Sequence, residues 1–260
     1  MKERGFRPVV VTRPLAQAGA FAARVADIGR APVIFPLLDI APVADSAALQ
    51  GMLSVLDRYA LAVFVSPNAI DAVFPFIPAW PREVAIGIVG EGSRLALQRH
   101  GIDDGNTTIY APRHRERMDS EELFKVLNLE RLHGRRVLIV RAQNGRELLT
   151  DMLRAKRIEV DHVTAYQRLL PCIDAARAEQ LRRLIDADSD WIITSSEALR
   201  NLLNITAETL GSDYVVKLQR NAIIVSHQRI AETAQSLAFS HVTMAGSGDE
   251  QLIAALQSQP

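Results

Sequence analysis

The sequence predicts an α/β protein with two similar domains, each built on a parallel sheet flanked by helices. Short runs rich in Val and Ile alternate with helical patterns almost throughout the 260 residues. These runs are apolar on both faces, which is the pattern of parallel strands covered by helices on both sides. An internal duplication then divides the strands and helices into two related sets.

The predicted strands follow one another along the whole chain. The first, at 9–11, leads into a predicted helix over 15–28 that Gly29 closes as a C-cap. Further strands are predicted at 32–35, 62–65, 84–89, 107–110, 136–140, 160–164, 191–194, 222–225 and 241–244. Each lies beside an amphipathic stretch, so helices are expected between them.

The duplication consists of four pairs of matching segments. They are VTRP at 11–14 with IVRA at 139–142, FVSPNA at 64–69 with ITSSEA at 193–198, IVGEGS at 88–93 with VSHQR at 225–229, and 107–123 with 241–252. Each of the two last helices is predicted to begin with a capping box, from Asp119 to Glu122 and from Ser247 to Glu250.

Two short segments predict where the chain crosses between domains. Residues 36–39 and 166–169 each follow a strand and precede a polar, irregular stretch. The predicted division is 1–36 plus 168–260 as one discontinuous domain, 41–164 as an inserted domain, and 37–40 and 165–167 as connectors. Two domains joined in this way are expected to face each other across a ligand-binding cleft with hinge motion.

Composition excludes several classes of function. With 30 basic and 30 acidic residues the formal net charge is zero, so neither nucleic-acid nor membrane-surface binding is expected. No apolar run approaches the roughly 20 residues of a membrane span, and no signal region follows Met1. The single Cys172 fits a reducing compartment, and the six histidines lack metal-ligand spacing. We therefore expect a cytoplasmic protein without a metal, and a monomer, since no apolar patch demands a dimer.

Polar residues follow the predicted strands, where they precede the next helix. Ser66 fits an N-cap, with Pro67 at the first helical position. Anions bind at such helix N-termini, and the carboxyl ends of parallel strands line one rim of a sheet. Residues of this kind recur in both repeats: Arg13, Ser66, Asn68, Ser93, Ser195 and Ser196. Capping alone explains any one of them, but the set favours a shared rim that binds a ligand with several acidic groups.

Other candidates each have a plainer alternative. Gly90, Glu91 and Gly92 do not complete a dinucleotide-binding motif, because Leu95 replaces the third glycine, and they fit a backbone that approaches a carboxylate closely. Arg141 and Arg146 are candidates for acidic substrate groups. The basic run 113–117 is another, although such runs are more typical of solvated loops.

Tyr166 lies at a predicted domain crossing. A phenol there is a candidate proton donor to a leaving group. The alternative is an aromatic side chain that packs the hinge with its hydroxyl satisfied locally.

Taken in order, these motifs resemble the uroporphyrinogen-III synthase family. The match is carried by VTRP, FVSPNA, VGEGS at 89–93, VLIVR at 137–141, AYQR at 165–168, ITSSEA and SGDE at 247–250. The resemblance implies two α/β domains joined by a two-stranded connector, and a reaction without a cofactor. In that reaction hydroxymethylbilane, a linear polycarboxylate tetrapyrrole, loses water and closes to uroporphyrinogen III with its last ring inverted.

The resemblance also implies roles for individual residues. Tyr166 matches the tyrosine that helps the hydroxyl leave, and the serines and Asn68 match carboxylate-binding positions of the cleft. The segment with His227 and Arg229 is looser than the family pattern, so their roles stay open. A transient contact with the preceding enzyme of the pathway also stays open. The alternatives are a non-catalytic tetrapyrrole-binding or regulatory relative and a periplasmic-type solute binder, which the missing signal peptide disfavours.

Overall fold

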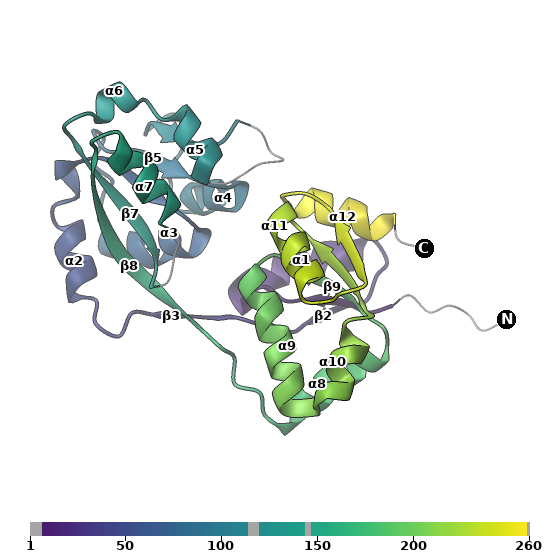
Figure 1. The fold of residues 1–260 in the computed structure, drawn as a ribbon. Coiled ribbons are helices and arrows are strands. Elements are labelled where there is room, and N and C mark those ends of the chain that lie inside the picture. Colours follow the sequence, from purple (N-terminus) through teal and green to yellow (C-terminus); the bar gives the residue numbers. More distant parts are fainter. Residues whose placement is uncertain (1–6, 114–119, 144–146, 259–260) are drawn as a thin grey trace. The chain divides into compact units, whose positions relative to one another are not determined.

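The computed structural model describes residues 7–113, 120–143 and 147–258 (Figure 1). The chain divides into two compact units. The first unit comprises Met1–Asp39 with Leu169–Pro260, and the second comprises Ile40–Arg168. Each unit is a sheet with helices packed against it, which confirms the predicted fold class.

The first unit contains a five-stranded sheet among its described residues, in the order β11-β10-β9-β1-β2, with every neighbouring pair parallel. The strands are β1 (Val9–Val11), β2 (Pro32–Ile34), β9 (Asp190–Ile193), β10 (Ala222–Val225) and β11 (His241–Met244). The helices are α1 (Leu15–Asp27), α8 (Ala175–Asp186), α9 (Ser196–Leu210), α10 (Ser212–Leu218), α11 (Gln228–Ser236) and α12 (Asp249–Gln257). Buried residues of α1 and α12 cover one face of the sheet, and those of α8, α9 and α11 cover the other.

The second unit contains a six-stranded sheet within the described part of the chain, in the order β3-β8-β7-β4-β5-β6. The strands are β3 (Asp39–Pro42), β4 (Tyr59–Phe64), β5 (Ala85–Ile88), β6 (Ile109–Tyr110), β7 (Arg136–Ala142) and β8 (Glu159–Leu169). The helices are α2 (Ala47–Leu53), α3 (Pro67–Val73), α4 (Glu91–Arg99), α5 (Ser120–Val126), α6 (Leu129–Leu132) and α7 (Leu148–Ala155), with short 3-10 turns η1 (Leu56–Arg58) and η2 (Phe74–Phe76).

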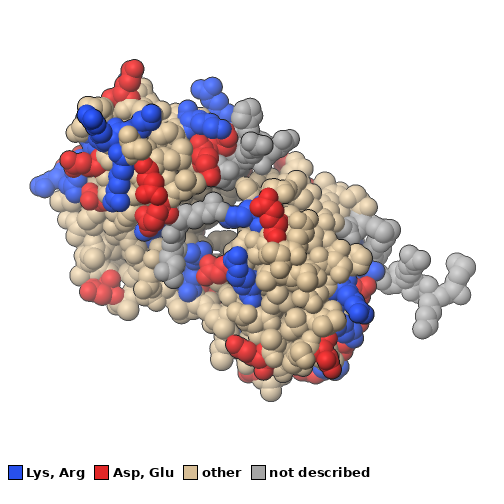
Figure 2. All heavy atoms as spheres, in the orientation of Figure 1, with Lys and Arg blue, Asp and Glu red and all other residues tan. Residues whose placement is uncertain are grey.

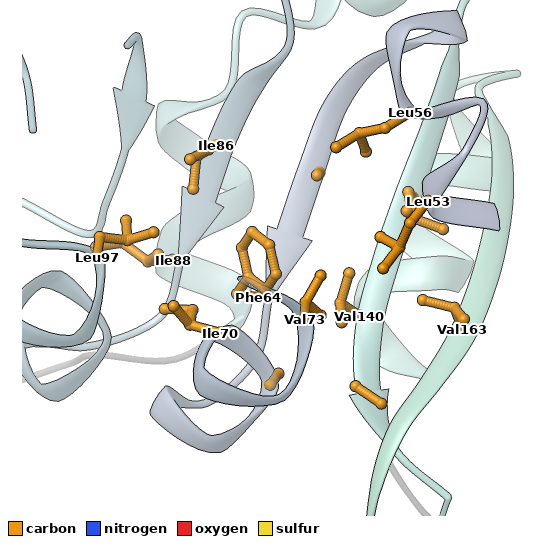
Figure 3. Close-up of a cluster of buried hydrophobic side chains, with 14 of the residues drawn as sticks. Leu53, Leu56, Phe64, Ile70, Val73, Ile86, Ile88, Leu97, Val140 and Val163 are labelled. Carbon is orange, nitrogen blue, oxygen red and sulfur yellow. The ribbon is translucent and has the colours of Figure 1, made fainter. Parts of the chain in front are cut away.

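Helices cover both faces of this second sheet as well. On one face, Phe64, Val140 and Val163 pack with Ile70 of α3 and Leu97 of α4 (Figure 3). On the other face, residues of α5 and α7 pack against alternate positions of the same strands. This burial on both sides accounts for the continuous apolar runs in the sequence.

The two sheets repeat the same topology. The order β11-β10-β9-β1-β2 in the first sheet corresponds to β6-β5-β4-β7-β8 in the second. In this correspondence β1 matches β7, β9 matches β4, β10 matches β5 and β11 matches β6. These are the pairs that the sequence repeat predicts. The internal duplication is therefore confirmed, and residues at matching strand ends of the two units are structurally equivalent.

Some boundaries differ from the prediction. β8 continues to Leu169, so the predicted connector 165–167 is part of a strand of the second sheet. Leu37, in the other predicted connector, is buried in the core of the first unit. The capping box at Ser247 is wrong: α12 begins after Gly248, where φ is 103°, and Ser247 Oγ instead donates to the Ser226 carbonyl at 3.4 Å. Asp119, of the other box, lies outside the described residues.

A polar cluster holds the amino ends of three strands of the second sheet. Tyr59 of β4 is 1% exposed, and its hydroxyl donates to Asp161 Oδ2 of β8 at 3.0 Å. Arg136 of β7 donates from Nη2 to the same oxygen at 2.5 Å, with its guanidinium 5.0 Å from the centre of the Tyr59 ring. Burial, followed by the hydrogen bond and charge of Asp161, raises the pKa of Tyr59 to about 12.

This shift predicts how the protein behaves at alkaline pH. Because the pKa of Tyr59 is raised above its ordinary value of 10.0, its contribution to stability is present below pH 10 and is lost as the pH rises toward about 12. Absorbance titration of the folded protein should therefore show one of the four tyrosines ionising well after a normal one. Tyr59→Phe should remove that late step, and a late step that persists in the variant would contradict the assignment.

Candidate functional site

The topology singles out one position on each sheet as a ligand site. In the second unit the chain moves from β4 outward to β5 and β6, and then returns to add β7 and β8 on the other side of β4. In the first unit the corresponding reversal lies between β1 and β9. Ligands of parallel sheets bind outside the carboxyl ends of the strands at such reversals. We call the residues that follow these strand ends the carboxyl rim of each unit.

The carboxyl rim of the second unit contains a hydrogen-bonded pair, Ser66 and Tyr166. Ser66 follows β4 and is the N-cap of α3, with extended backbone, and its Oγ accepts from the Ala69 amide at 3.2 Å. The Tyr166 hydroxyl lies 2.9 Å from the same Oγ, although the two residues are 100 positions apart in sequence. Tyr166 is 5% exposed, so its ring is fixed by packing. The pair joins a phenol on β8 to the helix that begins after β4.

An irregularity in β8 places Tyr166 on this face of the sheet. Arg141 of β7 pairs with Thr164, but the next residue, Ala142, pairs with Tyr166, so the register shifts by one residue. A β-bulge of this kind turns the following side chain to the opposite face. Tyr166 consequently packs in the same cluster as Ala142 and Phe64, which brings its hydroxyl to the end of β4.

The glycine segment before α4 packs beside this pair. A Cβ on Gly92 would lie 3.2 Å from Pro67 Cγ, so glycine lets α4 begin close to the start of α3. Gly90 is the N-cap of α4, with extended backbone and open space where a side chain would begin. Glu91 is exposed, and Asn68, in the first turn of α3, is half-buried. The structure thus brings Ser66, Asn68 and the glycine segment together at neighbouring strand ends.

Ser93 differs from the expectation. The sequence predicts that its hydroxyl lies on the rim, but the residue is 2% exposed. The buried positions of α4 are Ser93, Ala96 and Leu97, which share one face of the helix at a spacing of three to four residues. Ser93 therefore turns toward the core with the apolar residues of α4.

In the first unit, the hydroxyls of the carboxyl rim contact protein groups. Ser195 is the N-cap of α9 and accepts from the amides of Glu197 at 3.2 Å and Ala198 at 3.4 Å. Ser196 Oγ lies 3.0 Å from Thr233 Oγ1. Both serines are half-buried. They are positioned at the expected strand end, and they already serve as a cap and as a link between α9 and α11.

Two of the candidate arginines, Arg13 and Arg141, are ion-paired. Arg13 follows β1, and its Nη2 donates to Asp249 Oδ1 at 2.6 Å, with the guanidinium 4.5 Å from the centre of the Phe21 ring. Arg141, near the end of β7, donates from Nη2 to Glu147 Oε1 at 2.6 Å. Sequence reasoning did not single out Glu147, and the only signal for it was an acidic residue just ahead of a helix.

Arg141 and Tyr166 lie on opposite faces of the second sheet, because Ala142, the neighbour of Arg141 in β7, packs on the Tyr166 side. The Arg141 side holds His162, whose Nε2 lies 2.7 Å from Thr150 Oγ1. Burial, and then the charge of Arg141, lower the pKa of His162 below its ordinary value. The hydrogen bond that Arg141 donates to the Glu147 carboxylate lowers the pKa of Glu147.

His227, Arg229 and Arg146 are the other candidates from the sequence. His227 is the N-cap of α11, and its Nδ1 accepts from the Arg229 amide at 3.3 Å. Arg146 and most of the basic run 113–117 lie outside the described residues. Among the described residues, no group of three or more His, Cys, Asp or Glu side chains is arranged to hold a metal ion. No described helix is long and apolar enough to cross a membrane.

A cavity of about 520 Å³ in the second unit lies elsewhere on the sheet. It is lined by residues such as Leu56 and Pro81, which precede β4 and β5. It therefore lies toward the amino ends of the strands, away from the carboxyl rim. On the face shown in Figure 2, acidic and basic side chains are interspersed. We give the carboxyl rim priority because topology and hydrogen bonding both point to it.

Comparisons with known proteins agree on one family. The model of the family described as uroporphyrinogen-III synthase HemD matches residues 19–254. The chain is 28% identical to the uroporphyrinogen-III synthase of Escherichia coli (strain K12), over 96% of this chain and 99% of that protein. It is 27% identical to the enzyme of the same name from Salmonella typhimurium, again over 96% and 99%.

Solved structures of the same name share the fold. A mutant uroporphyrinogen III synthase from Thermus thermophilus superposes with a TM-score of 0.59 at 14% identity, over 97% of this chain and 96% of that one. The uroporphyrinogen-III synthetase from Helicobacter pylori 26695 also gives 0.59, at 13% identity, over 98% and 99%.

Proposed function

Because the chain belongs to the uroporphyrinogen-III synthase family, we propose that it closes hydroxymethylbilane to uroporphyrinogen III, with loss of water and inversion of the last ring. The family match spans most of the chain, and the relatives have nearly the same length. The observation in the structure that best supports this reaction is the Tyr166–Ser66 pair on the carboxyl rim of the second unit.

The substrate in this proposal is a flexible tetrapyrrole with many acetate and propionate groups. The carboxyl rim of the second unit offers it amide N–H groups at the start of α4, where Gly90 provides no side-chain cap, and the rim of each unit carries an arginine. Backbone donors at helix N-termini bind carboxylates without a large net positive charge. An overall neutral chain is therefore compatible with a polyacidic substrate.

Tyr166 is the proposed catalytic acid. Its proton passes to the departing hydroxyl, the C–O bond breaks, and water leaves as the adjacent pyrrole becomes an azafulvene. The substituted α-carbon of the last ring then attacks this electrophile and forms a spiro intermediate. The bond from that carbon to the preceding methylene breaks, and the unsubstituted α-carbon of the same ring bonds to the methylene instead, which inverts the ring. The proton lost from that carbon on rearomatisation returns to the phenolate. Proton uptake and release balance, so the net change is ring closure with loss of one water.

Ser66 is the proposed positioning residue for this acid. Its Oγ already accepts from the Ala69 amide and keeps a hydrogen that it can donate to the Tyr166 oxygen. In that arrangement the phenolic hydrogen is left for the substrate, and the phenolate that forms is stabilised by a hydrogen bond.

A product assay tests the proposed function. Purified protein is incubated with freshly prepared hydroxymethylbilane, and the oxidised products are separated into isomers I and III. Predominantly isomer III is expected, because an enzyme that holds the last ring must suppress the uninverted closure that occurs without it. Isomer I alone, in the presence of folded protein, would reject the enzyme and favour the non-catalytic alternative.

We also propose that the reaction needs no cofactor and that the protein acts as a cytoplasmic monomer. Activity that survives dialysis against a chelator and a single monomeric species in sedimentation are the expected results. The transient contact with the preceding enzyme stays a prediction.

A further inference from the structure

The two units share an arginine arrangement that capping does not explain. Arg13 and Arg141 lie at the carboxyl ends of β1 and β7, which occupy equivalent places in the two sheets. Each guanidinium donates from Nη2, at 2.6 Å, to a carboxylate of the protein itself: Asp249 in the first unit and Glu147 in the second. The same pairing thus appears in both repeats with different acidic residues.

Arg13 in particular is in an electrostatically costly position. The carboxyl rim is where helix N-termini point, and their positive dipole ends disfavour a cation. Arg13 lies two residues before α1, whose first turn contains no acidic residue. A cation at this rim is useful if it binds an anionic ligand. When no ligand is bound, a carboxylate of the protein takes the place of that anion.

The exposure of the two partners also differs. The arginine side chains are largely covered, with 16% and 15% exposed, whereas Asp249 and Glu147 are 34% and 51% exposed. The acid is thus the outer partner, which solvent and a ligand reach first. Within the described part of the chain, the Arg13 side chain donates to Asp249 from a single nitrogen, so this guanidinium has donors to offer a second carboxylate.

We propose that Asp249 and Glu147 each take the place of a substrate carboxylate on the carboxyl rim of their own unit. They neutralise Arg13 and Arg141 when no substrate is bound, and a substrate carboxylate competes for the same guanidinium. This inference rests on the proposed function, because it takes a polycarboxylate as the ligand. Its consequence is that both acids lower affinity for the tetrapyrrole and keep the arginines in place between turnovers.

Ordinary helix-surface ion pairs of this protein provide matched controls. Glu179 and Asp186 of α8 both pair with Arg182, at 2.6 and 2.9 Å, and are 46% and 30% exposed. They resemble Glu147 and Asp249 in exposure but lie three and four residues from Arg182 on the same helix, and Asp186 also pairs with Lys217 of α10 at 2.5 Å. Removing these charges should not change ligand affinity.

The test measures binding and turnover in four single variants of the full chain. Asp249→Asn and Glu147→Gln should each lower the Kd for uroporphyrin III, a stable macrocyclic polycarboxylate, by about threefold to tenfold, because one competing charge is removed. The KM for hydroxymethylbilane should fall in parallel. Asp186→Asn and Glu179→Gln should leave both values unchanged. Affinity is followed by tetrapyrrole fluorescence at fixed low salt.

A double variant ties the effect to the arginine. In Arg13→Met/Asp249→Asn the gain in affinity should disappear, since the guanidinium that the acid released is gone. Unchanged or weaker binding in folded Asp249→Asn and Glu147→Gln, or a gain that persists without Arg13, would overturn the inference. If Asp249→Asn does not fold, Asp249→Ser removes the same charge and keeps a side chain suited to a helix start.

Failure of the inference and failure of the proposed function are distinguishable. The proposed function fails if the wild-type protein gives no isomer III, whatever the variants bind. The inference alone fails if the wild-type protein gives isomer III while the acidic variants bind no more tightly.

Discussion

Tyr166→Phe is expected to lower kcat for hydroxymethylbilane by about tenfold to a hundredfold, at or below the lower end of what general acids contribute. The phenol is the proposed donor to the leaving hydroxyl, and its oxygen lies 2.9 Å from Ser66 Oγ. Phenylalanine keeps the ring that packs in the core of the second unit, so KM and the unfolding midpoint should change little. Steady-state kinetics and the isomer ratio of the product measure the effect, and the share of isomer I should rise.

Tyr59→Phe is the matched control for this variant. It also removes one hydroxyl from a buried tyrosine of the same sheet, but at the amino ends of the strands, where the partner is Asp161. This control should lose some stability and keep kcat. A folded Tyr166→Phe protein with wild-type kcat would remove Tyr166 from the chemistry and leave it as a packing residue.

The second large effect is expected on stability, at a buried ion pair in the first unit. Arg30 and Asp190 are 8% and 2% exposed, and Arg30 Nη2 donates to the Asp190 carboxylate. Arg30 also donates to the carbonyls of Leu256 and Arg7, each at 3.2 Å. It therefore links β9 to the end of α12 and to the residues before β1.

Arg30→Met should lower the free energy of unfolding by about 3–5 kcal/mol, because it leaves the Asp190 carboxylate buried without its cation. Urea denaturation measures this loss. Trp191 is fully buried in the first unit beside Asp190, so its fluorescence in a Trp80→Phe background reports on this unit alone. A probe that reports on one unit is needed because the two units need not unfold in one transition.

An exposed pair of the same unit serves as the control for Arg30→Met. Arg7 and Asp188 are 51% and 50% exposed and pair at 3.0 Å, so Asp188→Asn should cost less than about 1 kcal/mol. Equal losses in the two variants would show that the buried pair contributes no more than a surface pair.

Much of the fold could be predicted from sequence because local signals agree with the tertiary structure. The apolar runs identify the strands, and Ser66 and Ser195 both cap the helices that the sequence assigns to them. The repeat gives the matching strand orders of the two sheets. These features depend on residues near one another in sequence, or on comparison of one sequence repeat with the other.

Features that depend on distant residues could not be predicted in this way. The register shift in β8 that turns Tyr166 toward Ser66 depends on pairing with β7, and no local sequence pattern predicts it. The burial of Ser93 follows from how α4 packs. The partners of Arg13 and Arg141 are set by where α12 and α7 begin, which sequence spacing does not give for residues as far apart as Arg13 and Asp249.

The strand order of the first unit has a consequence for synthesis on the ribosome. β1 lies between β2, which follows closely, and β9, which begins at Asp190 after the whole second unit has been translated. The second unit is one continuous segment and has all its strands by residue 169, so it can fold first. Until β9 is made, the nascent β1–α1–β2 segment exposes the edge of β1 that β9 will later cover. This is the stage at which a chaperone would protect the chain.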